Sequence, residues 1–509
     1  MEESAARLPV FRPPSVHELE DLARRLGLPL APDEATAYAA LCEGLAPSYA
    51  RLAELAEPVR PVRYPRDGGS APARSENPYG AWAWRCEIAG AKGGPLAGER
   101  VGVKDNICVA GLPMRNGSRT LEGYTPVSDA TVVERILDAG GRIVGKTVCE
   151  DLCFSGGSHT SHPAPVRNPC NPRHSAGGSS SGSAAAIVAG DVTMCLGGDQ
   201  GGSVRTPAAW CGCVGLKPTH GLVPYTGIFS IETGLDHCGP MGRRVEDVAR
   251  LLGVIAGPDG LDSRQPAHAP GDYLAALSAG AKGLRVGIVR EGFVRPESEP
   301  ITDDRVRRVL AELTDAGAQV ETISISWHLD AYHIYTCIGL EGAAEITFKS
   351  DAMGYGWQGE RPGDLIRFWG ESWRSRPDRL PTIAKYTLLA SEHIRRTNGT
   401  AFYVKAQNLR REMRAAYDAA LASYDVLAMP TIPFRAPELP DPGCGVEETI
   451  TAALNMEGNT GPFDVSGHPA ISVPCGTEGG LPVGLMFIGK PLDEAAVLRA
   501  AAAVERLSL

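Results

Sequence analysis

Two turns rich in glycine and serine lie between residues 174 and 218, and each presents a serine that could take part in acyl transfer. The first turn, AGGSSSG, carries Ser179, and the second, GGDQGGSVR, carries Ser203. Glycines in such turns permit backbone conformations and close approaches that a side chain would forbid. Successive backbone N–H groups in the second turn could also stabilise the oxyanion of a tetrahedral intermediate. The two turns therefore indicate a nucleophile together with its oxyanion hole.

A lysine that could act as the base follows an apolar, strand-like run in the segment GERVGVKDNICVAG. Lys104 ends that run, where burying an ammonium group would be costly. The structural alternative is a lysine that extends its charged end to solvent. An isolated GGS triplet is likewise more often a flexible loop than a site. The catalytic interpretation therefore depends on all three elements occurring in one chain.

Lys104, the GGSS turn and the GGSxR turn together resemble the motif of the amidase signature family. Ser179 lies 75 residues after Lys104 and Ser203 lies 24 residues after Ser179, and the second spacing is typical of that family. The resemblance extends over residues 75 to 500 and includes DATVVERILDAGG, GLKPTHGLVPYTG, SGHPAISVPCG and LPVGLMFIG. The chain is most similar to the amidases that accompany nitrile hydratases, which carry an added N-terminal helical domain and the variants VCEDLCFSG and GGDQGGS.

The resemblance implies a role for each residue of the motif. Ser203 is the expected nucleophile, which attacks the carbonyl carbon of a carboxamide and becomes acylated. Ser179 is the expected bridging serine, which follows a non-proline cis peptide bond and passes protons between the nucleophile and the base. Lys104 is the expected general base, which requires a neutral amine. The expected oxyanion hole consists of the backbone N–H groups of Gln200, Gly201, Gly202 and Ser203.

Other residues near these turns are expected to position the reacting groups or the substrate. Asp199 and Arg205 flank the nucleophile and should hold its loop by hydrogen bonds and ion pairing. Ser180 should make local hydrogen bonds. The resemblance places Phe154 beside a substrate tunnel, and the side chain of Gln200 could reach the substrate. Related amidases accept aliphatic and aromatic amides, while an ester, a hydrazide or a carbamate is an alternative substrate for the same machinery.

Three other interpretations share parts of this pattern. Residues 178–182, GSSSG, match the G-x-S-x-G elbow of α/β-hydrolases, with Ser180 as nucleophile and His468 as a possible base. That elbow directly follows a strand, whereas the loop-like segment NPCNPRHSA precedes the turn here. A glutaminyl-tRNA amidotransferase A-like subunit would share the three reactive residues but would need partner subunits and a supply of ammonia. A binding protein without activity would be expected to have lost one of the three.

The elements that must position these residues alternate along the chain. Strand-like runs such as ERVGVKD, GRIVGK, LRVGIVR, AQVETISI, YDVLAMP and PAISVP alternate with helical runs such as ATVVERILDAGG and DDRVRRVLAELTDAG. The alternation predicts an α/β fold with a mixed central β-sheet that helices cover on both faces, as the amidase signature fold requires. Residues 326–424 are mainly helical in pattern and could form a cap-like insertion.

An N-terminal helical module precedes this region. Ser15 and Glu18 form a capping box before a stripe of leucines, which predicts a helix over residues 15–26. The segment 57–77 is rich in Pro, Gly, Ser and Arg and resembles a linker. We therefore expect a helical domain with its linker over residues 1–75 and the catalytic domain over 76–509. The leucine stripes are too short to bury themselves, so they should pack on the catalytic domain or on a second subunit, and the resemblance implies a homodimer.

Composition narrows the classes of partner. The net charge is −10 and no basic cluster occurs, so we expect no nucleic-acid partner. The start MEESAARLPVF lacks the basic and apolar parts of a secretory signal, and no apolar run reaches membrane-spanning length, which predicts a cytoplasmic protein without membrane contact. The thirteen cysteines include only two close pairs, Cys149 with Cys153 and Cys211 with Cys213, and neither has the spacing of a zinc site. The expected partner is a small amide substrate, with no metal and no cofactor.

Overall fold

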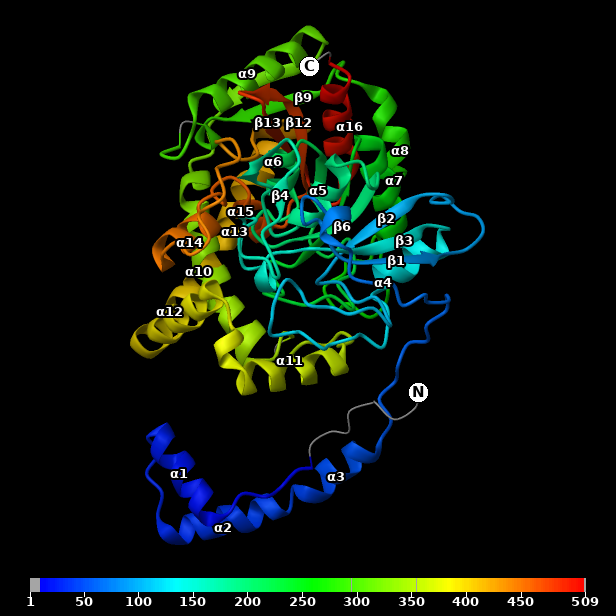
Figure 1. Ribbon diagram of the computed structural model, residues 1–509. Coiled ribbons are helices and arrows are strands. Elements are labelled where there is room, and N and C mark those ends of the chain that lie inside the picture. The colour runs from blue at the N-terminus through cyan, green and yellow to red at the C-terminus, as the bar shows by residue number, and fades with distance from the viewer. Residues whose placement is uncertain (1–9, 294, 354, 508–509) are drawn as a thin grey trace. The chain divides into compact units, whose positions relative to one another are not determined.

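The chain divides into two compact units. The computed structural model describes residues 10–293, 295–353 and 355–507 (Figure 1). One unit ends at Pro61 and the other begins at Val62. The start of the chain, residues 1–9, from which the localisation was argued, lies outside the described residues.

The boundary lies earlier than the one expected at residue 75. Residues 62–75 belong to the second unit because their side chains bond to it. The Tyr64 hydroxyl donates to Asp138 at 2.7 Å, and the Arg66 guanidinium pairs with Asp129. The Pro- and Gly-rich composition of this segment correctly indicates a lack of helix, but not a lack of tertiary contacts.

The first unit contains the helices α1 (Val16–Leu26), α2 (Pro32–Glu43) and α3 (Ala46–Glu54). The predicted capping box is present, because the Ser15 side chain accepts from Glu18 N–H and the Glu18 carboxylate accepts from Ser15 N–H. Gly27 ends α1 in the left-handed conformation with φ of 70°, which glycine adopts without a steric cost. The helix predicted over 15–26 is therefore confirmed.

An eleven-stranded sheet forms the centre of the second unit, in the strand order β1-β3-β2-β6-β8-β7-β12-β13-β11-β9-β10. A separate two-stranded sheet contains β4 and β5. The strands are β1 (Trp82–Ala89), β2 (Arg100–Lys104), β3 (Arg142–Thr147), β4 (Arg167–Asn168), β5 (Asn171–Ser175), β6 (Met194–Asp199), β7 (Val214–Lys217), β8 (His237–Gly242), β9 (Arg285–Val289), β10 (Gln319–Ile323), β11 (Val426–Pro430), β12 (Ala470–Glu478) and β13 (Leu481–Ile488).

The large sheet is mixed, as predicted. Strand β2 runs parallel to both β3 and β6, and β9 runs parallel to both β10 and β11. Antiparallel pairs join β1 to β3, β6 to β8, β8 to β7, β7 to β12, β12 to β13 and β13 to β11. All six strand-like runs named from the sequence are strands of this sheet.

Helices cover both faces of the sheet, because successive side chains of a strand point to opposite faces. In β6, Met194 and Leu196 join the large core cluster with α4, α7, α9 and α16, whereas Cys195 joins a second cluster with α5 and α6. The helices are α4 (Thr131–Asp138), α5 (Ser181–Val188), α6 (Arg205–Cys211), α7 (Val245–Ile255), α8 (Tyr273–Ala276), α9 (Pro300–Asp315), α14 (Val446–Leu454), α15 (Gly461–Ser466) and α16 (Glu494–Glu505).

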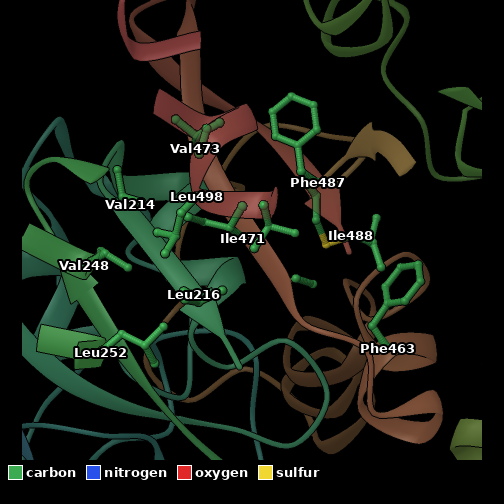
Figure 2. Close-up of a cluster of buried hydrophobic side chains, with 14 of the residues drawn as sticks. Val214, Leu216, Val248, Leu252, Phe463, Ile471, Val473, Phe487, Ile488 and Leu498 are labelled. Atoms are coloured by element: carbon green, nitrogen blue, oxygen red, sulfur yellow. The ribbon is translucent and has the colours of Figure 1, made fainter. Parts of the chain in front are cut away.

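The larger cluster joins strands and helices that are distant in the sequence (Figure 2). Full burial of one such aliphatic or aromatic side chain contributes about 1.5–3 kcal/mol. The side chains drawn there come from β7, α7, α15, β12, β13 and α16, and include Val214, Leu216, Val248, Leu252, Phe463, Ile471, Val473, Phe487, Ile488 and Leu498. This packing holds the C-terminal strands β12 and β13 against the strands that precede the cap.

The region predicted to be a helical cap is helical. It contains α10 (Trp327–Ala343), the π-helix η5 (Ala344–Lys349), α11 (Gly363–Ser375), the short 3₁₀ turn η6 (Pro377–Arg379), α12 (Thr382–Asn398) and α13 (Ala401–Leu421) (Figure 1). Further short 3₁₀ turns are η1 (Arg74–Glu76), η2 (Asp151–Cys153), η3 (Leu277–Ala279) and η4 (Arg290–Gly292). Helices α10 and α12 supply one wall of the cavity described next.

Candidate active site

Lys104 is the last residue of β2, between β3 and β6 in the interior of the sheet. Its side chain is fully buried. The Nζ atom donates to Ser179 Oγ at 2.7 Å and to the carbonyl of Gly198, on the neighbouring strand β6, at 3.1 Å. The interior lysine suggested by the apolar run is therefore present, and it contacts the first serine turn directly.

Ser179 follows a cis peptide bond between Gly178 and Ser179, as the resemblance implied. The turn is packed too tightly for a side chain at Gly178, where a Cβ atom would lie 2.7 Å from the Ser155 carbonyl oxygen. The Ser179 carbonyl accepts from the backbone N–H of Glu150 at 3.2 Å. The Ser179 hydroxyl thus contacts Lys104, while the Ser179 backbone is held by the N–H group of Glu150.

Ser203 lies in the turn between β6 and α6 and borders the cavity beside these residues. Its carbonyl accepts from Ser180 N–H at 3.1 Å, which links the two serine turns. The cavity has a volume of about 130 Å³ and is suited to a small substrate. The fold therefore brings the three residues predicted to react into one neighbourhood, with Ser203 at the accessible end.

A buried ion-pair network supports the nucleophile turn. Asp199 accepts from the N–H groups of Gly202 at 2.7 Å and Val204 at 3.0 Å, and Arg205 Nη2 donates to it at 2.9 Å. The same Arg205 atom donates to Asp464 at 2.7 Å. Burial by itself would raise the pKa of Asp199, but the charge and hydrogen bonds of Arg205 outweigh it and hold that pKa well below its usual range. Asp199 is therefore a charged clamp on the turn.

The hydrogen bonds of Asp199 reduce the number of backbone N–H groups in the turn that can bind an oxyanion. Because Gly202 N–H already donates to Asp199, it is not free to bind an oxyanion. In the described part of the chain, the N–H groups of Gln200, Gly201 and Ser203 have no protein acceptor. We therefore retain these three N–H groups as candidate donors.

Phe154 and Gln200, the two residues expected at the substrate, both line the cavity. The Phe154 ring stacks on Phe348 with ring centroids 5.9 Å apart. Gln200 Nε2 donates to the Tyr225 hydroxyl at 2.8 Å, and no described residue is bonded to Gln200 Oε1. Gln200 is thus held in place by its amide nitrogen, while its buried amide oxygen has no hydrogen-bond partner among the described residues.

Two carboxyl groups in the same cavity were not anticipated from the sequence. Burial raises the pKa of Glu457 to about 8, against the opposing effect of a hydrogen bond from Tyr335. Burial and the nearby charge of Asp236 raise the pKa of Glu232 to about 6. Glu457 precedes α15 and Glu232 lies in the loop between β7 and β8, and neither local pattern predicts an acid with a raised pKa. Their positions result from tertiary packing.

The geometry contradicts the α/β-hydrolase alternative. The Ser180 hydroxyl is fully buried and donates to the Gly198 carbonyl at 3.2 Å. The ring of His468 interacts with Ser466 at 2.9 Å through Nδ1 and with Asp418 at 3.0 Å through Nε2. Ser180 and His468 are thus each engaged with other partners, so they do not form a nucleophile–base pair.

The cysteine pairs do not join a metal cluster. Within the described ranges, no group of three or more His, Cys, Asp or Glu side chains is arranged to hold a metal ion. All thirteen cysteines are free thiols. Cys149 and Cys153 instead donate to the same side-chain oxygen, Asn116 Oδ1, at 3.4 and 3.2 Å.

Comparison with known proteins agrees with this geometry. Residues 80–498 match the family model described as Amidase, which includes β2, both serine turns and all strands after them. The chain belongs to the amidase family. An enantioselective amidase from Rhodococcus rhodochrous is 48% identical over 438 residues, which cover 85% of this chain and 84% of that protein.

Other relatives of this amidase family member carry a different name. The glutamyl-tRNA(Gln) amidotransferase A subunit of Exiguobacterium sibiricum is 39% identical over 422 residues, covering 82% of this chain and 86% of that protein. The crystal structure of the same amidotransferase component from Thermotoga maritima superposes with a TM-score of 0.70 at 32% identity, covering 85% of this chain and 88% of that chain. None of the described helices of this amidase family member is long and apolar enough to cross a bilayer.

Proposed function

We propose that this chain hydrolyses a carboxamide to the carboxylic acid and ammonia, with Ser203 as nucleophile, Ser179 as proton bridge and Lys104 as base. The observation that supports this most directly is the buried 2.7 Å hydrogen bond from Lys104 Nζ to Ser179 Oγ. A lysine and a serine in contact, beside a second serine that borders a cavity, provide a path for the nucleophile's proton.

In the first half of the reaction, Ser203 Oγ attacks the carbonyl carbon of the amide. Its proton moves to Ser179, and the Ser179 proton moves to the neutral amine of Lys104. The carbonyl oxygen becomes an oxyanion, which accepts hydrogen bonds from backbone N–H groups of the nucleophile turn. We assign this role to the unbonded N–H groups of Gln200, Gly201 and Ser203.

In the second half, the carbon–nitrogen bond breaks and Lys104 returns the proton through Ser179 to the leaving nitrogen. Ammonia departs and an acyl ester remains on Ser203. Water then attacks this ester while the same two residues take its proton, and they return a proton to Ser203 Oγ as the carboxylic acid is released. Bonds and protons balance without a metal or an organic cofactor.

The size and the lining of the cavity favour an amide substrate with a small acyl group. Phe154, Ile231, Leu235 and Leu340 give it an apolar wall, while Gln200 Oε1 can accept a hydrogen bond from the amide N–H₂. The name of the Rhodococcus relative, an enantioselective amidase, is consistent with this assignment. Esters, hydrazides and carbamates remain alternative acyl compounds for the same residues.

We also propose that the enzyme is a cytoplasmic homodimer that uses no nucleic-acid partner. Free thiols throughout the chain suit a reducing compartment, and the net charge of −10 disfavours contact with RNA. The first unit supports a dimer because its own packing leaves apolar side chains uncovered, including Leu22, Leu26, Leu28, Leu41, Leu45, Leu52 and Leu55.

The deciding experiment measures ammonia release from a panel of aliphatic and aromatic amides by the purified full-length chain alone. We expect turnover of at least one amide and none by the matched Ser203→Ala variant. A chain that released no ammonia alone, but amidated misacylated tRNA when other subunits were added, would contradict the proposal and favour the amidotransferase alternative. Parallel assays with matched esters and hydrazides would establish the acyl preference.

A further inference from the structure

We propose that Cys149 and Cys153 form a dithiol that hydroperoxides oxidise to a disulfide, and that this modification switches the active site off. The proposal rests on the catalytic assignment given above for Lys104 and Ser179. It adds a modification site whose two thiols have no part in the hydrolysis itself.

The two thiols are neighbours. Cys149 and Cys153 precede and end the turn η2, and each donates a hydrogen bond to Asn116 Oδ1, at 3.4 and 3.2 Å. Both sulfur atoms therefore lie within 3.4 Å of a single oxygen atom. A disulfide between them requires the two sulfur atoms to leave Asn116 Oδ1 and approach each other to about 2.05 Å.

Access to the pair is through the substrate cavity. Cys153 forms part of the cavity wall that also contains Ser203 and Gln200 and is 6% exposed, whereas Cys149 is 0% exposed. A small oxidant that enters the cavity therefore meets Cys153 first. Cys149 lies behind it, where it can react with Cys153 but not directly with a solute.

The surroundings also distinguish the two thiols chemically. Burial raises the pKa of Cys153, but in the form of the protein whose Lys104 is protonated the Cys149 thiol, the charge of Lys104 and hydrogen bonds with Ser179 and Lys104 outweigh burial and lower that pKa to about 6. Burial raises the pKa of Cys149 well above its usual range. Since the thiolate is the nucleophile, Cys153 is the thiol that attacks the oxidant and Cys149 is the thiol that resolves the product.

The reaction has two balanced steps. The Cys153 thiol first loses its proton, and the thiolate attacks one oxygen of the hydroperoxide, so that an S–O bond forms, the O–O bond breaks, and the other oxygen leaves and takes up that proton to become water or an alcohol. The Cys149 sulfur then attacks the Cys153 sulfur, forming the S–S bond and releasing the sulfenic oxygen as water, with the Cys149 proton. Two thiols are oxidised and one hydroperoxide is reduced.

Oxidation should disturb the base and the bridging serine. A disulfide removes both hydrogen bonds to Asn116 and draws the Cys153 sulfur away from Ser179 and Lys104. The turn that carries Cys153 has little freedom to compensate, because Leu152 and Cys153 already have positive φ angles of 51° and 62°. Phe154 follows directly, so the cavity wall would change as well.

The test treats the full-length protein with hydrogen peroxide and follows the mass of one peptide. Trypsin should release residues 147–167, which contain both Cys149 and Cys153. We expect this peptide to lose two hydrogen atoms and to resist alkylation, while amide turnover falls by roughly tenfold or more. Dithiothreitol should restore the mass, the alkylation and the turnover.

Three variants complete the test. After peroxide treatment, Cys153→Ala should keep the turnover it had before treatment, and Cys149→Ala should carry a dimedone-reactive sulfenic acid at Cys153. Cys170→Ala, which removes an exposed cysteine away from the site, should respond as the wild type does. If the wild-type peptide kept both thiols alkylatable, or if Cys153→Ala lost turnover as the wild type does, the proposal would be overturned.

The peptide mass requires no enzymatic activity, so it separates failure of this proposal from failure of the catalytic assignment. Should Cys153→Ala fail to fold, mapping of the wild type and of Cys149→Ala still decides the outcome. An oxidised peptide 147–167 in a protein with unchanged turnover would also overturn the claim that oxidation switches the site off.

Discussion

The side-chain nitrogen of Lys104 lies 2.7 Å from the hydroxyl oxygen of Ser179, and both side chains are fully buried. The other acceptor of Lys104, the Gly198 carbonyl at 3.1 Å, is uncharged. Lys104 is thus held by one side chain and one backbone group in the interior of the sheet. This buried contact favours a role for Lys104 as a base over the role of a cation at the surface, and substitution of Lys104 tests it.

Replacing Lys104 by arginine should not preserve activity. Arginine keeps the positive charge but cannot give up its proton in a protein, so the variant would lack a base. We expect kcat/KM to fall by about 10²–10⁴-fold in both Lys104→Arg and Lys104→Ala. Steady-state kinetics on a turned-over amide measures this, and circular dichroism verifies folding. Near wild-type turnover in Lys104→Arg would mean that Lys104 is only an electrostatic support.

Ser203 and Ser179 should respond differently to removal of their hydroxyl groups. Ser203→Ala should form no acyl-enzyme, whereas Ser179→Ala should retain a slow reaction, about 10²–10⁴-fold below wild type, because the nucleophile is still present. A fluorophosphonate label mapped by mass spectrometry should lie on Ser203. Stoichiometric label on the buried Ser180 would show that the nucleophile has been assigned to the wrong residue.

Loss of Arg205 should destabilise the fold as well as the nucleophile turn. The guanidinium pairs with Asp199 at 2.9 Å and with Asp464 at 2.7 Å, and all three side chains are fully buried. Arg205→Ala leaves the buried Asp199 carboxylate without its cation and Asp464, whose pKa burial raises well above its usual range, without a hydrogen-bond donor, which should lower the free energy of unfolding by about 3–5 kcal/mol. Denaturant titration measures the change.

The matched control for that variant is Arg308→Ala. Arg308 pairs with Glu478 at the surface, and its side chain is 56% exposed. Its loss should change the free energy of unfolding by about 1 kcal/mol or less. Equal destabilisation by the two variants would mean that the buried network has no special role.

Stability near neutral pH should depend on Glu150, which is fully buried behind Ser179 and accepts hydrogen bonds from Thr160 and Ser181. Burial raises its pKa from 4.5 to about 7. Between these values the folded state holds a proton that the unfolded state has lost, so the stabilisation is present below pH 4.5 and is lost as the pH rises through 7.

Glu150→Gln cannot titrate, so its free energy of unfolding relative to wild type should rise between pH 4.5 and 7 by up to about 3 kcal/mol. Thermal or denaturant unfolding at several pH values measures this difference, which is independent of the hydrogen bonds that glutamine loses at every pH. A difference that stays constant with pH would show that the Glu150 carboxyl does not have the raised pKa.

Truncations should locate the boundary of the catalytic unit. A chain that begins at residue 62 keeps the Arg66–Asp129 and Tyr64–Asp138 contacts, whereas one that begins at residue 71 loses both. We expect the melting temperature of the first chain to match that of full-length protein and that of the second to be lower. Light scattering should report the mass of a single truncated chain in both cases, since the leucine-bearing helices proposed to join the dimer are gone. A mass of two truncated chains would show that these helices are not needed for the dimer.

Much of the catalytic centre could be predicted because its signals are local. An apolar run ending at Lys104 predicts an interior strand, and glycine turns predict where Ser179 and Ser203 are presented. Each of these positions depends on a few neighbouring residues. The sheet strands named from the sequence are likewise short, apolar and bounded by turn residues, which is why they could be identified without tertiary information.

The remaining features depend on contacts between distant parts of the chain. Glu150 and Glu232 stand in ordinary local sequence, and only packing by other segments buries them. The contacts that join residues 62–75 to the second unit were not predicted for the same reason, because Arg66 bonds to Asp129, which is 63 residues further along the chain. Asn116, which joins Cys149 and Cys153, gave no signal either, since a single asparagine before a glycine indicates only a turn.

The cavity walls come from several separate stretches of sequence. Residues between 104 and 203 carry the reacting groups on the sheet and its turns, whereas Tyr332 and Leu340 of α10 and Ile383 of α12 line the same cavity from later helices. The reacting groups thus lie outside α10 and α12, whereas these two helices contribute only to the wall that contacts the substrate. Exchange of α10 to α12 between relatives could redirect such an enzyme to new acyl groups while its reaction stays the same, so this segment is the natural target for recombination and library design.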